Sequence, residues 1–255
     1  MQAHWRGELS LFTYVFVNGR ARLTQVKLGT AQTLPDRSRS PGRSGRACLA
    51  AIDRCSKLPA TIRAMQGMSG QRYRTLINTL VANLDQAHYL EIGSWLGSTA
   101  AAAIFGNTVQ ALCIDNWSQF SGSKEQFLAN VEQAESSGSS LQLIERDFRK
   151  VDYRMLGKFN VFLFDGPHSA ENHRDGILLV QPCLTDRFVL IVDDWNWLTV
   201  RLGTMSDLLA AKCHVEASVQ VRTTMDNTIP SVAYEASDWH NGYFIAVVRK
   251  QRRYH

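Results

Sequence analysis

The chain has 255 residues, and its 45% hydrophobic content is enough for a large buried core. Its formal charge of +5 lies at one end, because residues 1–50 carry a net +6 and residues 51–255 carry a net −1. A neutral core argues against binding to a nucleic-acid backbone, and no run reaches the ~18 apolar residues of a membrane span. Five scattered cysteines without C-x-x-C spacing argue against a disulfide scaffold or a zinc site and favour a cytoplasmic protein.

The first 46 residues are expected to form an extension, with the main domain over residues 47–255. Two β-prone runs flank Asn18-Gly19, a dipeptide that favours the type I′ turn of a β-hairpin. Because a lone hairpin is marginal in water, it must dock on the core, pair with a partner or stay loose. Residues 31–46 are rich in Ser, Arg, Pro and Gly and predict a linker, with a phosphate-binding arginine-serine tract as the less favoured alternative.

From about residue 70 the patterns of helix and strand alternate. Apolar spacing predicts helices over residues 71–84, 98–105, 124–137 and 170–184. Short apolar runs predict strands over residues 88–93, 109–115, 141–147, 159–166 and 187–195. Two final β-prone segments, residues 215–224 and 242–250, lack an intervening helix and predict an antiparallel pair at one edge. The pattern is that of an α/β fold whose parallel sheet is covered by helices on both faces.

The stretch LEIGSWLGST places two glycines, Gly93 and Gly97, just after the first core strand. In open α/β sheets ligands bind beyond the carboxyl ends of the strands, and such a turn lets the backbone approach them closely. The next helix offers its N-terminal amides, with Ser98 or Thr99 able to cap it. No G-x-G-x-x-G is present for a dinucleotide. Glu91 suits a positively charged ligand, such as a sulfonium that carries an ammonium group.

On these residues the chain from about Gly70 to Lys250 resembles the class I S-adenosylmethionine-dependent methyltransferases. The resemblance implies a Rossmann-like, doubly wound seven-stranded sheet that is mostly parallel, with a C-terminal antiparallel hairpin. It also implies that Asp115 takes the ribose hydroxyls and that Asp147 lies near the adenine amine. Trp95 stands where the commoner motif has its middle glycine. The full set of expected cofactor contacts is Glu91, Gly93, Ser94, Gly97, Ser98, Thr99, Asp115, Asn116, Asp147 and Asp165.

Two later strands end in carboxylates, in FLFDGPH and LIVDDWNW. Asp165, Asp193 and Asp194 should therefore converge, and such carboxylates either have raised pKa values or hold a cation, with Mg²⁺ favoured and Ca²⁺ or Mn²⁺ as alternatives. The pattern resembles metal-dependent O-methyltransferases of the catechol, macrocin and aminocoumarin-sugar types. That resemblance implies metal ligands at these three aspartates and a base at His168, where the catechol type has lysine. Capping by the Asp pair or by His168 is the structural alternative.

The remaining candidates concern the methyl acceptor, which is expected to be a small, sugar-containing molecule, with no nucleic-acid partner. Aromatic walls are expected from Trp117, Trp195, Trp197, Trp239 and His240. Arg201 is either a reader of an acidic group or a helix surface residue, and His173 and His214 are expected at the surface. A homo-oligomer is left open. The rival functions are a nicotinamide oxidoreductase and a non-catalytic binding module with a methyltransferase-like fold.

Overall fold

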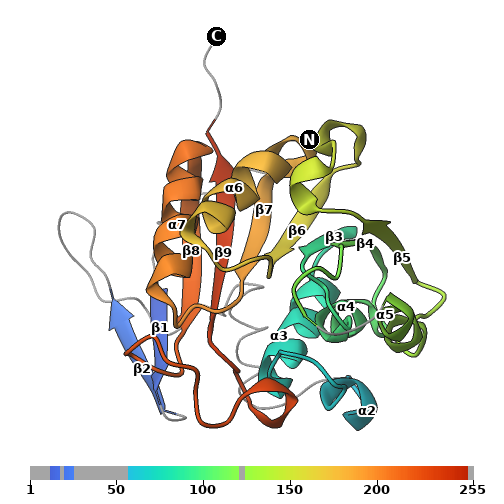
Figure 1. The fold of residues 1–255 in the computed structure, drawn as a ribbon, viewed down its shortest axis with the longest axis horizontal. Helices are drawn as coiled ribbons and strands as arrows, with labels where there is room; N and C mark the ends of the chain where they lie inside the picture. The colour runs from blue at the N-terminus through green and yellow to red at the C-terminus, as the bar shows by residue number, and fades with distance from the viewer. Residues whose placement is uncertain (1–11, 18–19, 26–56, 121–123, 252–255) are drawn as a thin grey trace.

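A seven-stranded sheet in the order β5-β4-β3-β6-β7-β9-β8 forms the centre of the fold (Figure 1). The computed structural model describes residues 12–17, 20–25, 57–120 and 124–251. The strands of this sheet are β3 (Ala87–Ile92), β4 (Val109–Asp115), β5 (Ser139–Glu145), β6 (Phe159–Phe164), β7 (Leu184–Val192), β8 (Cys213–Val221) and β9 (Tyr243–Lys250). The five strands from β3 to β7 run parallel to one another. Strand β9 lies between β7 and β8 and is antiparallel to both. The predicted fold class and the antiparallel C-terminal pair are confirmed.

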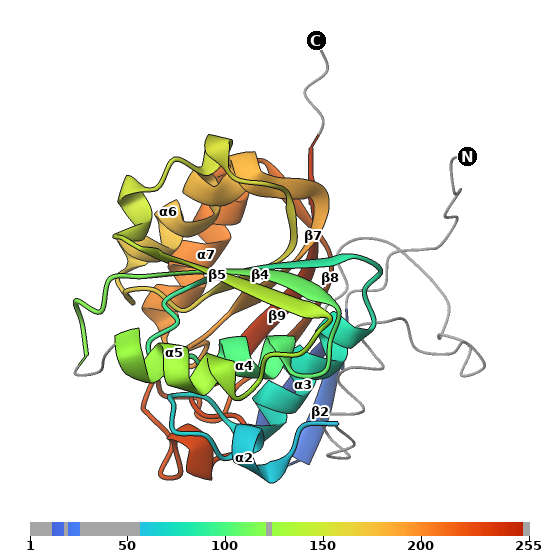
Figure 2. The same ribbon diagram turned by 90° about the vertical axis from the view of Figure 1, so that its right-hand side faces the viewer.

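Helices cover both faces of the sheet (Figure 2). One face carries α2 (Ala60–Arg63), α3 (Gln71–Ala82), α4 (Ser98–Ile104) and α5 (Lys124–Glu132), and the other carries α6 (Ala170–Val180) and α7 (Leu198–Ala210). Alternate residues of each strand enter the two layers, since successive strand side chains point to opposite faces. In β6, for example, Val161 and Leu163 join the first core and Phe162 and Phe164 the second.

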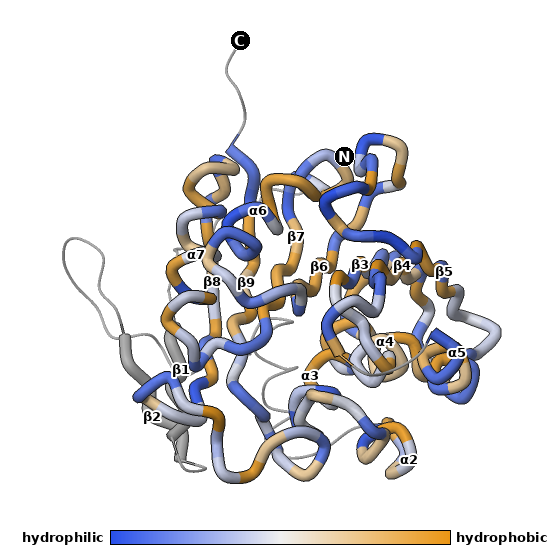
Figure 3. The backbone as a smooth tube through the Cα atoms, in the orientation of Figure 1, coloured by the Kyte–Doolittle hydropathy of each residue, from blue (hydrophilic) through white to orange (hydrophobic). Residues whose placement is uncertain are grey.

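The central strands are hydrophobic along most of their length (Figure 3). This is the pattern expected of strands that are buried on both faces, and it explains why short apolar runs located them in the sequence. The helices predicted over residues 124–137 and 170–184 end four to five residues early, at Glu132 and Val180. The helix predicted to Leu184 ends at Val180, because Pro182 lies in a short 3-10 turn that leads directly into β7.

Near the N-terminus, β1 (Phe12–Val17) and β2 (Arg20–Gln25) pair antiparallel, as the hairpin prediction requires. The Asn18-Gly19 turn and the predicted linker over residues 31–46 lie outside the described residues. Of the helices that the structure describes, none has both the length and the apolar composition needed to cross a bilayer.

Candidate active site

A cleft of about 1080 Å³, including its open mouth, lies over the carboxyl ends of β3, β4, β6 and β7. Parallel strands place their carboxyl ends on one edge of the sheet, so residues far apart in sequence meet there. Most of the predicted site residues line this cleft, namely Gly93, Ser94, Ser98, Thr99, Asp115, Asn116, Asp147, Asp165, His168, Asp193 and Asp194. Glu91 and Gly97 do not.

The two glycines of the first turn both adopt positive φ angles, +85° at Gly93 and +80° at Gly97. A Cβ on Gly93 would lie 1.9 Å from the carbonyl oxygen of Asp165, so only glycine lets the β3 and β6 ends approach. A Cβ on Gly97 would instead meet the ring of Phe127 at 2.8 Å. Gly97 is thus required for packing against α5 and does not line the cleft, and its contact with the cofactor stays a prediction.

Glu91 is fully buried beneath the cleft, and its carboxylate is satisfied by protein groups. One oxygen accepts a hydrogen bond from the Tyr89 hydroxyl, and the other accepts one from Thr99 Oγ1 at 2.8 Å. Burial raises the pKa of Glu91 to about 7. Within the protein, Glu91 positions the first turn of α4 through Thr99, and its attraction to a cationic ligand stays a prediction.

The predicted side-chain cap of α4 is absent from this described turn. Gly97 is the N-cap residue, and no side chain accepts from the first amides of the helix. Thr99 Oγ1 is used by Glu91, and Ser98 Oγ lies 3.0 Å from Ser69 Oγ. The reason is that both hydroxyls lie inside the first turn, one and two positions beyond the N-cap.

Asp115 connects the loops that follow the first two core strands. Its two carboxylate oxygens accept hydrogen bonds from the backbone N–H groups of Trp95 and Trp117, each at 2.7 Å. The Trp117 indole also donates to the Trp95 carbonyl at 2.9 Å. Each carboxylate oxygen keeps a second lone pair for a ligand. Asp115 is therefore held rigidly at the edge of the cleft, where the expected ribose acceptor should be.

Asn116 and Asp147 lie in the turns that follow β4 and β5. Asn116 is exposed and its Oδ1 accepts from the Ser118 hydroxyl at 2.8 Å. Asp147 begins a short 3-10 turn and accepts from the backbone N–H of Arg149 at 3.0 Å. Both side chains line the cleft at the end formed by β4 and β5.

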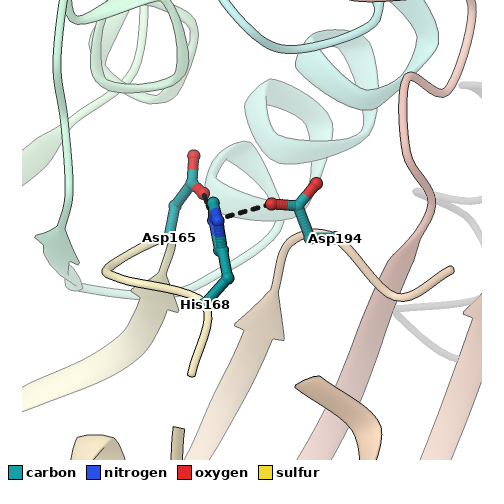
Figure 4. Close-up of side chains that lie close together, drawn as sticks. All are labelled: Asp165, His168 and Asp194. Atoms are coloured by element: carbon teal, nitrogen blue, oxygen red, sulfur yellow. Dashed lines mark ion pairs between the residues drawn. The ribbon is translucent and has the colours of Figure 1, made fainter. Parts of the chain in front are cut away.

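Three charged side chains meet at the other end of the cleft, after β6 and β7 (Figure 4). The imidazole of His168 lies between two carboxylates, with Nε2 2.7 Å from Asp194 Oδ2 and 3.7 Å from Asp165 Oδ1. One ligand atom from each residue lies within 4.8 Å of the others, which is close enough to surround one metal ion. The donor set brought together is Asp165, His168 and Asp194, whereas the expected set contained Asp193 in place of His168.

His168 does not have the ionisation state expected of a general base. Burial opposes its charged form, but the interactions with Asp165 and Asp194 outweigh burial and raise the pKa of His168 to about 10. Between two carboxylates the imidazole is a cation at neutral pH, so it has no lone pair to accept a proton. The prediction of His168 as a neutral base is therefore corrected: His168 is a charged imidazole that bridges Asp165 and Asp194.

The three aspartates are driven to different ionisation behaviour by their surroundings. Burial, followed by opposing effects of His168 and Asp194, raises the pKa of Asp165 to about 6. Burial and repulsion from the other two carboxylates raise the pKa of Asp193 well above its usual range. Burial opposes ionisation of Asp194, but His168 and Asn241 outweigh it and lower its pKa. The cluster thus favours ionisation of Asp194 and opposes ionisation of Asp193.

The structural alternatives for these residues do not hold. Helix α7 has Trp197 at its N-cap, without a side-chain cap from the Asp pair, and α6 is capped by Ser169. Asp194 has a φ of +58°, a backbone conformation that is costly outside glycine. Asp193 Oδ1 accepts the backbone N–H of Asp194 at 2.6 Å and so supports this turn.

The predicted aromatic walls are present only in part. Trp117 and His240 line the cleft, and Trp197 meets the His168 ring edge-on at 4.9 Å. Trp195 is instead buried in the core and stacks on Phe244, because it follows β7 on the face covered by α6 and α7.

Two further side chains expected near the acceptor have other roles in the structure. Trp239 packs against the core on the face of the sheet that α2 to α5 cover. Arg201 donates to the carbonyls of Trp195 and Asn196, so it stabilises the β7–α7 turn.

Two histidines were expected at the surface, and His214 is indeed exposed. The expectation for His173 is wrong, because this residue is only 2% exposed. His173 lies on the inner face of α6, where its ring meets the edge of Phe164 at 4.9 Å.

An asparagine network that the sequence did not reveal supports the charged cluster. Asn241 Nδ2 donates to Asp194 Oδ1 at 2.6 Å, and Asn196 Nδ2 donates to Asn241 Oδ1 at 2.9 Å. Asn196 also accepts from the backbone N–H of Thr223 at 2.9 Å. The dipeptide Asn241-Gly242 was the available signal, and by local rules it indicates only a turn.

Comparison with known proteins gives the family. A profile of the methyltransferase-domain family matches residues 90–195, which extend from β3 to just past the Asp193–Asp194 pair. The chain contains a class I S-adenosylmethionine-dependent methyltransferase domain. The sheet order with antiparallel β9 agrees with this assignment. The match favours a methyltransferase over a nicotinamide oxidoreductase. Among curated proteins, none matches the sequence.

Solved structures support the fold of this methyltransferase. A protein from Corynebacterium glutamicum is 14% identical, with 82% of this chain and 99% of that chain covered and a TM-score of 0.54. Cofactor-bound Rv0187 from MTB is 15% identical, with 83% and 92% covered and a TM-score of 0.51. The chain spans about half the length of the methyltransferase candidate SMU.776, crystallised with SAH (12% identity, 69% and 49% covered, TM-score 0.47).

Proposed function

We propose that this methyltransferase transfers the methyl group of S-adenosylmethionine to a hydroxyl oxygen of a small, sugar-containing molecule, with help from a divalent ion. The observation that carries the proposal is the group Asp165, His168 and Asp194, which shares one cleft with the expected cofactor contacts. The group lies after β6 and β7, whereas Asp115 and Asp147 follow β4 and β5. The cleft can therefore hold the cofactor at one end and the acceptor at the other.

At the cofactor end, the ribose hydroxyls would bind to Asp115 and the adenine amine would lie near Asp147. Gly93 would lie beneath the methionine part, where no side chain intervenes, and Ser94, Ser98, Thr99 and Asn116 would complete the contacts. Methyl transfer is a direct displacement for which the cofactor supplies the leaving group. The protein contributes mainly by positioning the two reactants.

At the acceptor end, the residues present fit a divalent ion. Two carboxylates and one imidazole are a suitable donor set, and among the expected divalent ions the mixed oxygen and nitrogen ligands favour Mn²⁺ over Mg²⁺. His168 would hold the ion through an unprotonated nitrogen, since imidazole coordinates a metal only in that form. When bound, the ion would supply Lewis-acid polarisation of the acceptor hydroxyl. Asp193 would support Asp194 through the backbone contact at 2.6 Å.

Asp165 is the group best suited to accept the proton of the acceptor hydroxyl. One of its carboxylate oxygens is enough to hold the ion, which leaves the other to accept the proton. It lines the cleft beside Gly93, on the side toward the cofactor. His168 would then orient Asp165 and Asp194 through its contacts with both carboxylates.

The ion is tested by calorimetric titration of the purified full chain with Mn²⁺ and Mg²⁺, before any acceptor is known. Asp194→Asn should weaken binding by more than about tenfold, since it removes a charged ligand. Asp186→Asn is the matched control, because Asp186 is an exposed carboxylate at the opposite end of β7. Equal affinity of both variants, or no binding to the wild-type protein, would remove the metal from the proposal.

The transfer itself is tested with labelled S-adenosylmethionine and a panel of hydroxyl compounds. Asp165→Asn should reduce turnover by about 10²–10⁴-fold, the usual contribution of a general base. Normal turnover in this variant would show that Asp165 is not the proton acceptor.

A further inference from the structure

His240 lies in the loop before β9, and neighbouring residues fix both its backbone and its imidazole ring. Its backbone N–H donates to Ser237 Oγ at 2.8 Å, and its carbonyl accepts from Thr223 Oγ1 at 2.8 Å. The ring of Tyr234 stacks on the imidazole, with centroids 5.2 Å apart and planes 26° apart. His240 is 7% exposed and lines the cleft together with Asp194.

The hydrogen bonding of the ring decides where its proton lies. The backbone N–H of Tyr234 donates to His240 Nδ1 at 3.0 Å. A nitrogen that accepts a hydrogen bond carries no proton, so the imidazole is neutral and its hydrogen is on Nε2. Since Nδ1 is used by the protein, Nε2–H is the ring donor that remains for a ligand.

This arrangement is maintained at an energetic cost. Both Tyr234 and His240 have positive φ angles, +57° and +45°, which are unfavourable for residues other than glycine. Ser237 secures the turn, because its hydroxyl donates to the Tyr234 carbonyl at 2.6 Å while it accepts from His240. Strained residues clustered beside a cleft are typical of binding sites, where the surrounding structure enforces a working geometry.

The neighbouring residue ties this donor to the charged cluster. Asn241 Nδ2 donates to Asp194 Oδ1 at 2.6 Å, so one short segment delivers His240 to the cleft and orients Asp194. His240 therefore lines the same cleft as Asp165, His168 and Asp194.

Resting on the proposed function, we propose that His240 is a specificity-determining residue whose Nε2–H binds a second oxygen of the acceptor, next to the hydroxyl that is methylated. A fixed neutral donor recognises a hydroxyl or ether oxygen without demanding a negative charge. The substrate class is thus a molecule with oxygens on adjacent carbons, such as a vicinal diol of a sugar ring. A compound that lacks the second oxygen would leave the Nε2–H group unpaired in the cleft, which is costly.

Two substitutions separate the parts of the imidazole. In H240N the amide oxygen can replace Nδ1 as acceptor for Tyr234, but no donor remains at the position of Nε2. Asparagine also tolerates positive φ. In H240Q the side-chain amide nitrogen takes the position of Nε2. H214Q, on the exposed His214 of β8, is the matched control. All variants are compared for melting temperature and S-adenosylmethionine affinity before they are assayed.

The acceptor probes are catechol and methyl glucosides, each beside the analogue that lacks one hydroxyl. The wild-type enzyme and H240Q should prefer the diols. H240N should lose about tenfold in that preference through KM, with little change in kcat, cofactor affinity or melting temperature. An unchanged preference in H240N would overturn the role of His240.

Nitrogen-15 NMR of histidine-labelled protein tests the donor without an acceptor. The His240 signals, assigned by their absence in H240Q, should show an unprotonated Nδ1 and a protonated Nε2. A proton on Nδ1 would overturn the proposal. If no hydroxyl compound is methylated, the proposed function fails, whereas the NMR result still decides whether His240 presents this donor.

Discussion

Replacing the buried His173 by leucine should remove a specific loss of stability in mild acid. His173 is 2% exposed, and among the described residues neither of its ring nitrogens has a hydrogen-bond partner. Burial, followed by the positive charge of His168, lowers the pKa of His173 to about 3. In the folded protein it therefore stays neutral over the whole range from pH 7 to pH 5.

The magnitude follows from the difference between the folded and unfolded states. An unfolded histidine has a pKa near 6.5, so in the window between about 3 and 6.5 the unfolded chain binds one more proton than the folded protein. Stability must then fall as the pH falls through this window. At pH 5 the distance from 6.5 is about 1.5 units, worth about 2 kcal/mol at about 1.36 kcal/mol per unit, and at pH 7 the contribution is only about 0.2 kcal/mol.

The assay is urea unfolding of the wild-type protein and His173→Leu at pH 5, 6 and 7. The free energy of unfolding of the wild type should drop by about 2 kcal/mol more than that of the variant between pH 7 and pH 5. His214→Leu, on the exposed face of β8, should follow the wild type. Parallel pH profiles for wild type and His173→Leu would refute the reasoning and show that His173 is protonated or solvated in the folded state.

Three further substitutions test other parts of the site. Gly93→Ala should destabilise the fold by at least about 2 kcal/mol in thermal melts and weaken cofactor binding, because Gly93 has a φ of +85° and the new Cβ would meet the Asp165 carbonyl. The control Gly157→Ala should be neutral or slightly stabilising, since no atom lies within 4 Å of its new Cβ. Asp115→Asn should weaken S-adenosylmethionine binding by about 1.5–3 kcal/mol in calorimetry, and unchanged affinity would count against the ribose contact. Arg74→Met should cost about 3 kcal/mol or more in urea unfolding, since the fully buried guanidinium donates to the carbonyls of residues 62, 63, 65 and 67. Exposed Arg154→Met should stay within about 0.5 kcal/mol.

The order of the elements was predictable because each carries a local signal. Apolar runs such as the one over β6 marked strands buried on both faces, and helical spacing marked α3. The rule that parallel strands place their carboxyl ends on one edge then brought Asp115 and Asp165 into one cleft. These steps need only sequence periodicity and the geometry of an α/β sheet.

The errors came from burial, which depends on segments distant in sequence. His173 was expected at the surface, but Phe164 and the inner face of α7 enclose it. A Cβ added to Gly203 of α7 would lie only 2.7 Å from the Cβ of His173. Trp195 was expected beside the acceptor, but it stacks on Phe244 of β9. No local pattern around either residue reports on which partner lies across the sheet.

The sequence by itself determined which residues stand at the strand ends and therefore which groups meet in the cleft. Only the tertiary structure decided their chemistry. Glu91 lies beneath the cleft, where Tyr89 and Thr99 donate hydrogen bonds to its carboxylate, and it positions the first turn of α4. His168 is a cation because two carboxylates from different strand ends flank it. Position follows from local periodicity, whereas ionisation follows from desolvation and from charges brought close by folding.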